Sequence, residues 1–207
     1  MAQFFAIHPS NPQQRLLDAV ADIVRGGGLI VYPTDSCYAL GCQLSDKSAA
    51  ERLRRVRQTG KDHNFTLVCR DLSEIATYAR VDNWAYRLIR GLTPGPYTFI
   101  LRATGEVPKR LQHVKRRSIG IRVPDHAIAQ GILKTLGAPI MSSTLILPGD
   151  DGPMTDATEI RARLERLVDG VVDGGSCGLD PTTVVDLSGG EAVVLRQGKG
   201  KAAFLGA

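Results

Sequence analysis

Two hydroxyl side chains lie in a loop that follows a short apolar run of the sequence. Thr34 and Ser36 come after residues 29–32, which are expected to form a buried strand that Pro33 ends. Past the end of a strand, hydroxyls and free backbone N–H groups can converge on an oxygen atom of a ligand. The same residue types favour turns, so the segment taken alone is more typical of a turn than of a binding site.

A first cluster of cations lies at the end of an expected helix and consists of Arg52, Arg54, Arg55, Arg57 and Lys61. Cations are favourable at a helix C-terminus in any case. Phosphate binding and a solvated helix face are therefore both open interpretations of this cluster.

A second cluster precedes the expected strand at 118–123 and consists of Lys109, Arg110, Lys115, Arg116 and Arg117. Such a loop could clamp a nucleic-acid backbone by charge. The stretch contains no aromatic side chain for base stacking, so the expected RNA contact is electrostatic and weakly sequence-selective.

Arg122 differs from the other cations because Ile121 and Val123 flank it inside an expected strand. An unpaired cation is costly in such a place. Its partner could be the carboxylate or phosphate of a ligand, or an internal carboxylate. Both alternatives are open from the sequence.

Other side chains argue against several classes of site. The four cysteines form no CxxC pair and fit neither zinc-ligand spacing nor a dense disulfide framework, so we expect reduced thiols and no bound metal. No histidine has triad-like neighbours, and Ser142 is not set in a GxSxG elbow. Nucleophilic hydrolase chemistry is therefore not predicted.

Alternating helices and strands must position these residues. Besides 29–32, strands are expected at 65–69, 97–101, 118–123, 139–143, 170–173, 182–187 and 192–196. Helices are expected from Asn11 to Gly26, from Ser45 to Arg57, and near 83–90, 125–136 and 156–167. The last two strands are too close for a helical crossover and must pair antiparallel if they pair, so we expect a mixed sheet.

The composition predicts one domain over residues 1–207. The chain shows no internal repeat or low-complexity linker, and its formal net charge of +5 points mildly to anionic partners. No apolar run approaches the roughly 20 residues that span a bilayer, and the first residues lack a basic segment followed by a long apolar one. We therefore expect a cytoplasmic protein that makes no use of a membrane.

Several stretches, taken together, resemble the YrdC/YciO family in order and spacing. They are 32–41 (YPTDSCYALG), 93–99 (TPGPYTF), 119–126 (IGIRVPDH) and 181–187 (PTTVVDL), and the stretch 63–71 (HNFTLVCRD) resembles the YciO branch. The match runs over nearly the whole chain. It implies an α/β fold: a twisted, open, mixed sheet flanked by helices, with a concave basic surface.

The resemblance also implies an activity, that of an L-threonylcarbamoyl adenylate synthase in tRNA modification. Such enzymes join L-threonine, bicarbonate and ATP, which comes with Mg²⁺, and release pyrophosphate. No tightly bound cofactor is implied. The alternative is a nucleotide- or double-stranded-RNA-binding protein without synthase activity, and tRNA is a further expected partner.

Roles for individual residues follow from the same resemblance. It places Thr34 and Ser36 at the positive cleft, Arg122 and Thr182 at the threonine, and Arg196 near the adenylate. Ser142 is a further ligand-binding position. The residues expected to neutralise the triphosphate during catalysis are Arg55, Arg57 and Thr144.

Two departures from the family pattern put full activity in doubt. Arg55 stands where the synthases carry the lysine of a Lys-x-Arg pair, and a short insertion follows Arg57. Ile146 stands where they carry the asparagine of Ser-x-Asn. An amide that binds a charged phosphate contributes roughly 1.5–3 kcal/mol, and an aliphatic side chain forfeits that contact.

Overall fold

The computed structural model describes residues 1–59, 65–113 and 115–203. Its strands are β1 (Gln3–Ala6), β2 (Ile30–Tyr32), β3 (Ala39–Gln43), β4 (Thr66–Val68), β5 (Ala79–Arg80), β6 (Tyr97–Ala103), β7 (Ser118–Arg122), β8 (Ile140–Thr144), β9 (Gly170–Asp173), β10 (Thr183–Asp186) and β11 (Val193–Arg196). Its helices are α1 (Gln14–Arg25), α2 (Lys47–Arg57), α3 (Leu72–Tyr78), α4 (Asn83–Leu92), the 3₁₀ turn η1 (Lys109–Leu111), α5 (Ala127–Leu136) and α6 (Ala157–Leu164).

Within these described residues, the strands form one open mixed sheet of 11 strands in the order β1-β9-β2-β3-β8-β4-β7-β6-β10-β11, and β5 pairs with β6. Parallel pairs such as β1 with β9 stand beside antiparallel pairs such as β3 with β8. β10 and β11 pair antiparallel. The predicted fold class and the predicted terminal pairing are confirmed.

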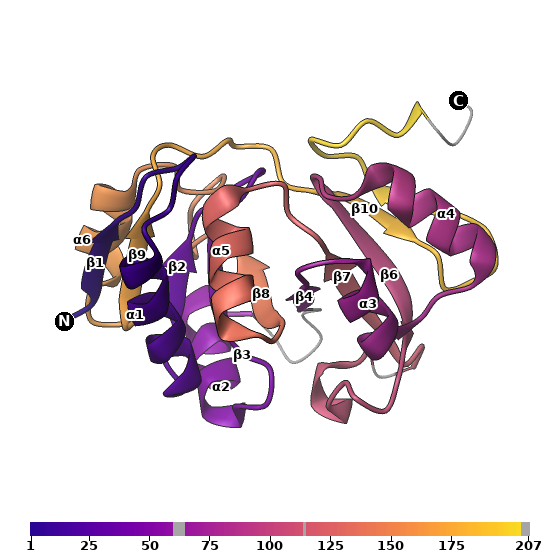
Figure 1. Cartoon of the computed structure of the whole chain (residues 1–207), viewed down its shortest axis with the longest axis horizontal. Helices are drawn as coiled ribbons and strands as arrows, with labels where there is room; N and C mark the ends of the chain where they lie inside the picture. The colour runs from indigo at the N-terminus through magenta and orange to yellow at the C-terminus, as the bar shows by residue number, and fades with distance from the viewer. Residues whose placement is uncertain (60–64, 114, 204–207) are drawn as a thin grey trace.

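Apolar residues fill both faces of the sheet, as the two-residue period of a strand requires. In β2, Ile30 and Tyr32 pack in one cluster with α1 and α5, whereas Val31 belongs to the cluster on the other face. Figure 1 shows α1 and α5 side by side in the left half of the molecule and α3 and α4 in the right half. The candidate site lies on β8, β4, β7, β6 and β10, which follow one another in the sheet.

Two helix starts differ from expectation. α1 begins at Gln14, and its N-cap Gln13 makes no side-chain capping bond. The expected cap, Asn11, instead donates its backbone N–H to His8 Nδ1 at 3.1 Å. α2 begins at Lys47 because the carboxylate of Asp46 accepts the N–H of Ala49 at 2.9 Å, which makes Asp46 the cap rather than Ser45.

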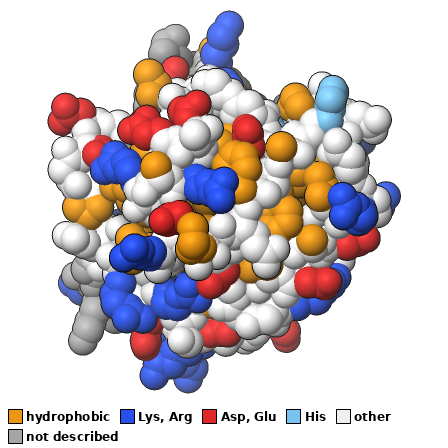
Figure 2. Space-filling view, turned by 90° about the vertical axis from the view of Figure 1, so that its left-hand side faces the viewer, with side chains coloured by type: hydrophobic (Ala, Val, Ile, Leu, Met, Phe, Trp, Pro, Cys, Tyr) orange, Lys and Arg blue, Asp and Glu red, His pale blue; other side chains and the backbone are white. Residues whose placement is uncertain are grey.

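One end face of the molecule carries mixed charge. Figure 2 shows that side, formed by the elements at the left of Figure 1, and acidic and basic side chains are interspersed there with apolar ones. The excess positive charge of the chain is therefore not gathered on this face. Among the described residues, no helix is both long enough and apolar enough to cross a membrane.

Candidate functional site

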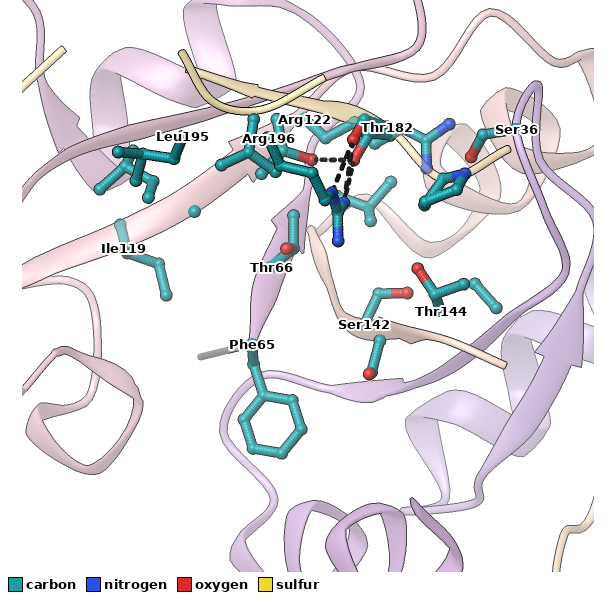
Figure 3. A pocket seen from close by; sticks show the side chains of 18 of the residues that line it. Ser36, Phe65, Thr66, Ile119, Arg122, Ser142, Thr144, Thr182, Leu195 and Arg196 are labelled. Carbon is teal, nitrogen blue, oxygen red and sulfur yellow. Dashed lines mark hydrogen bonds between the residues drawn. The ribbon is translucent and has the colours of Figure 1, made fainter. Parts of the chain in front are cut away.

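A cavity of about 420 Å³ lies on one face of the strands β8, β4, β7, β6 and β10. Alternate residues of these strands face it, among them Ser142, Thr66, Gly120 and Thr98. Ser142 pairs with Thr66 across β8 and β4, and Thr66 pairs with Gly120 across β4 and β7. Small and hydroxyl-bearing residues thus form a row across the sheet, which leaves room for a polar ligand (Figure 3).

Gly120 lines this cavity without a side chain and so leaves its space open. A Cβ atom at this position would lie 3.2 Å from Thr98 Cγ2 and 3.3 Å from Thr66 Oγ1. Both contacts are tighter than ordinary van der Waals packing, so a larger residue would push neighbouring strands apart or fill the space.

The charge of the lining has one sign. Among the described residues that line the cavity are four arginines, Arg57, Arg116, Arg122 and Arg196, and no aspartate or glutamate. Cations that converge on a concave, partly buried site favour a ligand with phosphate or carboxylate groups.

Arg122 is held by an internal carboxylate. Its side chain forms an ion pair with Asp35, and both side chains are almost fully buried, with exposed fractions of 8% and 10%. Arg122 also donates to Thr34 Oγ1 at 3.3 Å. Of the two alternatives left open by the sequence, the structure shows the internal ion pair. Arg122 Nε and Asp35 Oδ2 still have no hydrogen-bond partner among the described residues.

Thr34 and Ser36 have different roles in the loop after β2. The hydroxyl of Thr34 donates to the carbonyl of Cys37 at 2.6 Å and accepts the N–H groups of Ser36 and Cys37 at 3.2 and 3.3 Å. Thr34 therefore shapes the turn, and it is absent from the described cavity lining. Ser36 lines the cavity. The loop is both the turn and part of the site.

Thr182 and Arg196 meet at another wall of the cavity. Arg196 donates to the Thr182 carbonyl from Nη2 at 2.9 Å and from Nε at 3.2 Å. The Thr182 hydroxyl lies 2.8 Å from that of Thr98. Desolvation lowers the pKa of Arg196 from its ordinary value, although an arginine stays charged at neutral pH.

The helix α2 separates Arg55 from Arg57. Residues two positions apart in a helix point about 200° apart around its axis. Arg57 therefore reaches the cavity, whereas Arg55 is exposed and does not line it. Burial lowers the pKa of Arg57, and its Nε has no partner among the described residues. Of the two arginines that were predicted to neutralise the triphosphate, the structure brings Arg57 to this cavity and leaves Arg55 outside its lining. Lys61, of the same predicted cluster, lies outside the described residues.

The segment at the end of β8 brings Ser142, Thr144 and Ile146 to the cavity. Ser142 is fixed by two bonds, because its hydroxyl donates to the Leu40 carbonyl at 2.9 Å and accepts from Tyr32 Oη at 2.9 Å. Burial raises the pKa of Tyr32 to about 12, so this phenol stays a donor. Ile146 adds an aliphatic residue to the lining of the cavity.

The five residues of the second basic cluster have different surroundings in the structure. Arg110 donates to the carbonyls of Leu44 and Ser45 at 3.2 and 2.9 Å and so braces the start of α2. Arg116 pairs with Asp186 at 3.0 Å and lines the cavity. Lys109 and Arg117 line a neighbouring hollow. Lys115 is exposed and lines neither. Three of the five cations, Lys109, Arg116 and Arg117, thus share one hollow, whereas Arg110 is bound to the loop before α2.

The sequence reasoning missed the hydroxyl row of Thr66, Thr98 and Ser118 with Gly120. A signal for it exists, because small or polar residues alternate with large apolar ones in 65–67 and 118–121. In a half-buried strand such alternation marks one polar face.

No group of three or more histidine, cysteine, aspartate or glutamate residues that could hold a metal ion occurs in the described part of the chain. The cysteines also offer no ionised nucleophile. Cys37 lines the cavity, and burial raises its pKa. Burial likewise raises the pKa of Cys177 to about 11 and that of Cys42 to about 12.

We therefore expect the thiols of the native protein to react slowly with a thiol reagent at pH 8. A pKa near 11 leaves roughly a thousandth of a thiol ionised at that pH, against about a quarter for an ordinary cysteine. Reaction should accelerate as pH rises towards 11, and unfolding in guanidinium should expose all four thiols at once. Fast reaction of the folded protein at pH 8 would contradict this account.

Comparison with known proteins identifies the family of the chain. The sequence model of the Sua5, YciO and YrdC proteins, described as "Telomere recombination", matches residues 22–198. The chain belongs to the Sua5/YciO/YrdC family. The resemblance predicted from the sequence motifs is confirmed.

Three members of the Sua5/YciO/YrdC family show how the likeness is distributed. The uncharacterized protein YciO of Escherichia coli (strain K12) is 56% identical over 97% of both chains, and its crystal structure matches with a TM-score of 0.94 over 97% of this chain and 98% of that one. The threonylcarbamoyl-AMP synthase of Stenotrophomonas maltophilia (strain K279a) is 29% identical over 86% of this chain and 96% of its own. P. abyssi Sua5 complexed with L-threonine is 23% identical and shares the fold with a TM-score of 0.87, over 94% of this chain and 57% of that one.

Proposed function

We propose that the protein binds ATP, L-threonine and bicarbonate in the 420 Å³ cavity and forms threonylcarbamoyl-AMP, at a rate lowered by Ile146. The observation that carries this proposal is the convergence of four arginines and a row of hydroxyls, without a carboxylate, among the described lining residues. The family likeness supports it, because one relative is a threonylcarbamoyl-AMP synthase and another binds L-threonine.

The reaction needs no covalent intermediate on the protein. The threonine amine condenses with bicarbonate to give a carbamate and water. A carbamate oxygen then attacks the α-phosphorus of ATP, the bond from that phosphorus to the bridging oxygen breaks, and pyrophosphate leaves with Mg²⁺ as part of the substrate. The protein contributes position and charge, which are the main terms in phosphoryl-group chemistry.

Each group in the cavity has a task in this proposal. Arg57 and Thr144 hold the triphosphate, Arg196 lies at the adenylate, and Arg122 and Thr182 hold the threonine. Arg122 lines the cavity and Asp35 does not, so in this proposal Arg122 is the group that attracts the threonine carboxylate. The buried ion pair with Asp35 holds the Arg122 side chain in place at the cavity wall.

The purified protein should therefore release pyrophosphate from ATP in a manner that depends on both threonine and bicarbonate. A coupled pyrophosphate assay with Mg²⁺ measures this, with omission of each substrate as the control. Binding of ATP without threonine-dependent release would favour the second candidate function, a nucleotide-binding protein without synthase activity. Ile146 on the cavity wall is the observation that favours that candidate.

Two substitutions in one helix test the assignment of the cavity. Arg57→Gln should weaken ATP binding roughly 10- to 150-fold, because a charge-assisted contact contributes about 1.5–3 kcal/mol. Arg55→Gln removes the same charge from the same helix outside the cavity and should change affinity far less. Calorimetric titration with ATP and Mg²⁺ compares the two variants. Equal losses would show that ATP does not bind in this cavity.

A further inference from the structure

A second hollow lies beside the first cavity, and its lining is also basic. It has a volume of about 810 Å³ and is lined by Arg80, Arg102, Lys109, Arg116 and Arg117 together with polar groups. No aspartate or glutamate stands among its described lining residues. Arg116 is the lining cation that pairs with a carboxylate, that of Asp186. For Arg80, Lys109 and Arg117 the described residues provide no ion-pair partner.

Two cations of this hollow face each other across a sheet edge. Arg80 of β5 and Arg102 of β6 are direct partners in an antiparallel pair. Like charges placed directly opposite each other destabilise a sheet. An anion between them would remove this repulsion.

A third cation occupies an unfavourable backbone conformation. Arg117 has φ +50°, in the left-handed region that glycine and asparagine favour. The backbone there is pinned, since the Arg117 N–H donates to the His113 carbonyl at 2.8 Å and its carbonyl accepts from Ala103 at 2.9 Å. The turn would be formed more easily with glycine, so the side chain of Arg117 is the feature that needs explanation.

The lining favours bare phosphate over a nucleobase. Among the described residues no phenylalanine, tyrosine or tryptophan lines the hollow, His113 is its one aromatic ring, and Ala103 is its one apolar side chain. Bases of single-stranded RNA need stacking surfaces, and a duplex is bound over a broad face rather than in a hollow. The volume lies in the range of small-molecule sites.

We propose that this second hollow binds an inorganic oligophosphate, pyrophosphate or triphosphate, between the Arg80–Arg102 pair and Arg117. This goes beyond the proposed function, since binding requires no reaction in the first cavity. The two are neighbours all the same, because His113 and Arg116 line both. Pyrophosphate that is released in the first cavity could therefore bind in the neighbouring second hollow.

The test uses an Arg57→Gln background, which removes a cation that lines the first cavity and not the second hollow and so weakens anion binding in the first cavity. Inorganic triphosphate is titrated calorimetrically at low salt. Adding Arg117→Gly should weaken binding at least tenfold while the melting temperature holds or rises, because glycine relieves the left-handed strain. Adding Arg80→Thr should weaken binding similarly and also relieve the like-charge pair. Lys134→Gln, an exposed cation of α5, is the matched control for net charge and should leave affinity within twofold.

Unchanged triphosphate affinity in both hollow variants would overturn the proposal, and so would an equal loss in the Lys134→Gln control. A short RNA duplex provides a further arm. If the duplex binds through Arg80 and Arg117 and triphosphate fails to compete with it, the hollow serves RNA and the proposal is wrong. Failure of the proposed synthase reaction alone leaves these results unaffected, because no threonine or bicarbonate is present.

Discussion

Replacing Arg122 by methionine should lower the free energy of unfolding by about 3–5 kcal/mol at pH 7. The side chain is 8% exposed and its partner Asp35 is 10% exposed, so the substitution leaves a carboxylate buried without its cation. Adding Asp35→Asn in the same chain should recover much of the loss, because the unpaired charge is then removed as well. Denaturant unfolding followed by circular dichroism measures each difference.

Arg116→Met is the matched control for this prediction. Arg116 also pairs with an aspartate, at 3.0 Å, but its side chain is 60% exposed. Exposed ion pairs contribute about 1 kcal/mol or less, and Asp186 retains bonds from the N–H and hydroxyl of Ser188. If Arg122→Met lowers the free energy of unfolding no more than Arg116→Met does, the buried ion pair does not stabilise the fold as predicted.

The same pair shows how far the sequence could lead. The position of Arg122 between apolar neighbours in a strand identified a buried cation that needs an anion, but nothing in the sequence chose Asp35 over a ligand. That choice depends on the loop after β2 folding back over β7, which is a contact between residues 87 positions apart. Local patterns cannot determine such long-range contacts.

Local sequence patterns also predicted some strands and helices and missed others. Those rich in β-branched residues, such as β9 and β10, were predicted near their observed bounds. β3 was missed because Ala39–Gln43 contains no β-branched or aromatic residue. α3 was also missed, although Asp71 caps it by accepting the N–H of Glu74 at 2.9 Å and Glu74 accepts the N–H of Arg70. This spacing of an acidic cap and a glutamate three residues later is a recognisable helix start.

The basic residues were the hardest to place. Arg54, Arg55 and Arg57 are close in sequence, yet α2 directs them to different surroundings. Arg54 stacks over the ring of Phe65 with 4.7 Å between the guanidinium carbon and the ring centroid, Arg55 is exposed, and Arg57 lines the cavity. A cluster of cations in a sequence therefore predicts a basic surface. The direction in which each residue points from the helix decides which of them lines the cavity.

Restoring an amide on the cavity wall with Ile146→Asn should raise threonine-dependent pyrophosphate release about tenfold or more. Ile146 lines the cavity two residues beyond Thr144, so an asparagine there can donate a hydrogen bond to a phosphate oxygen. A contact of roughly 1.5–3 kcal/mol made in the transition state corresponds to about 10- to 150-fold in rate. Initial rates at saturating ATP, with and without threonine, measure the effect.

Two further variants decide what a change in rate means. Ile146→Leu keeps an aliphatic side chain of the same size and should leave the rate unchanged, so it separates the amide contact from simple repacking. Arg55→Lys restores the other family residue, but position 55 is exposed and away from the cavity lining, so it should add little to Ile146→Asn. If Ile146→Asn folds normally and the double variant still shows no gain, the amide is not the missing contact. The low rate must then originate in the segment after Arg57, or the protein binds its nucleotide without turning it over.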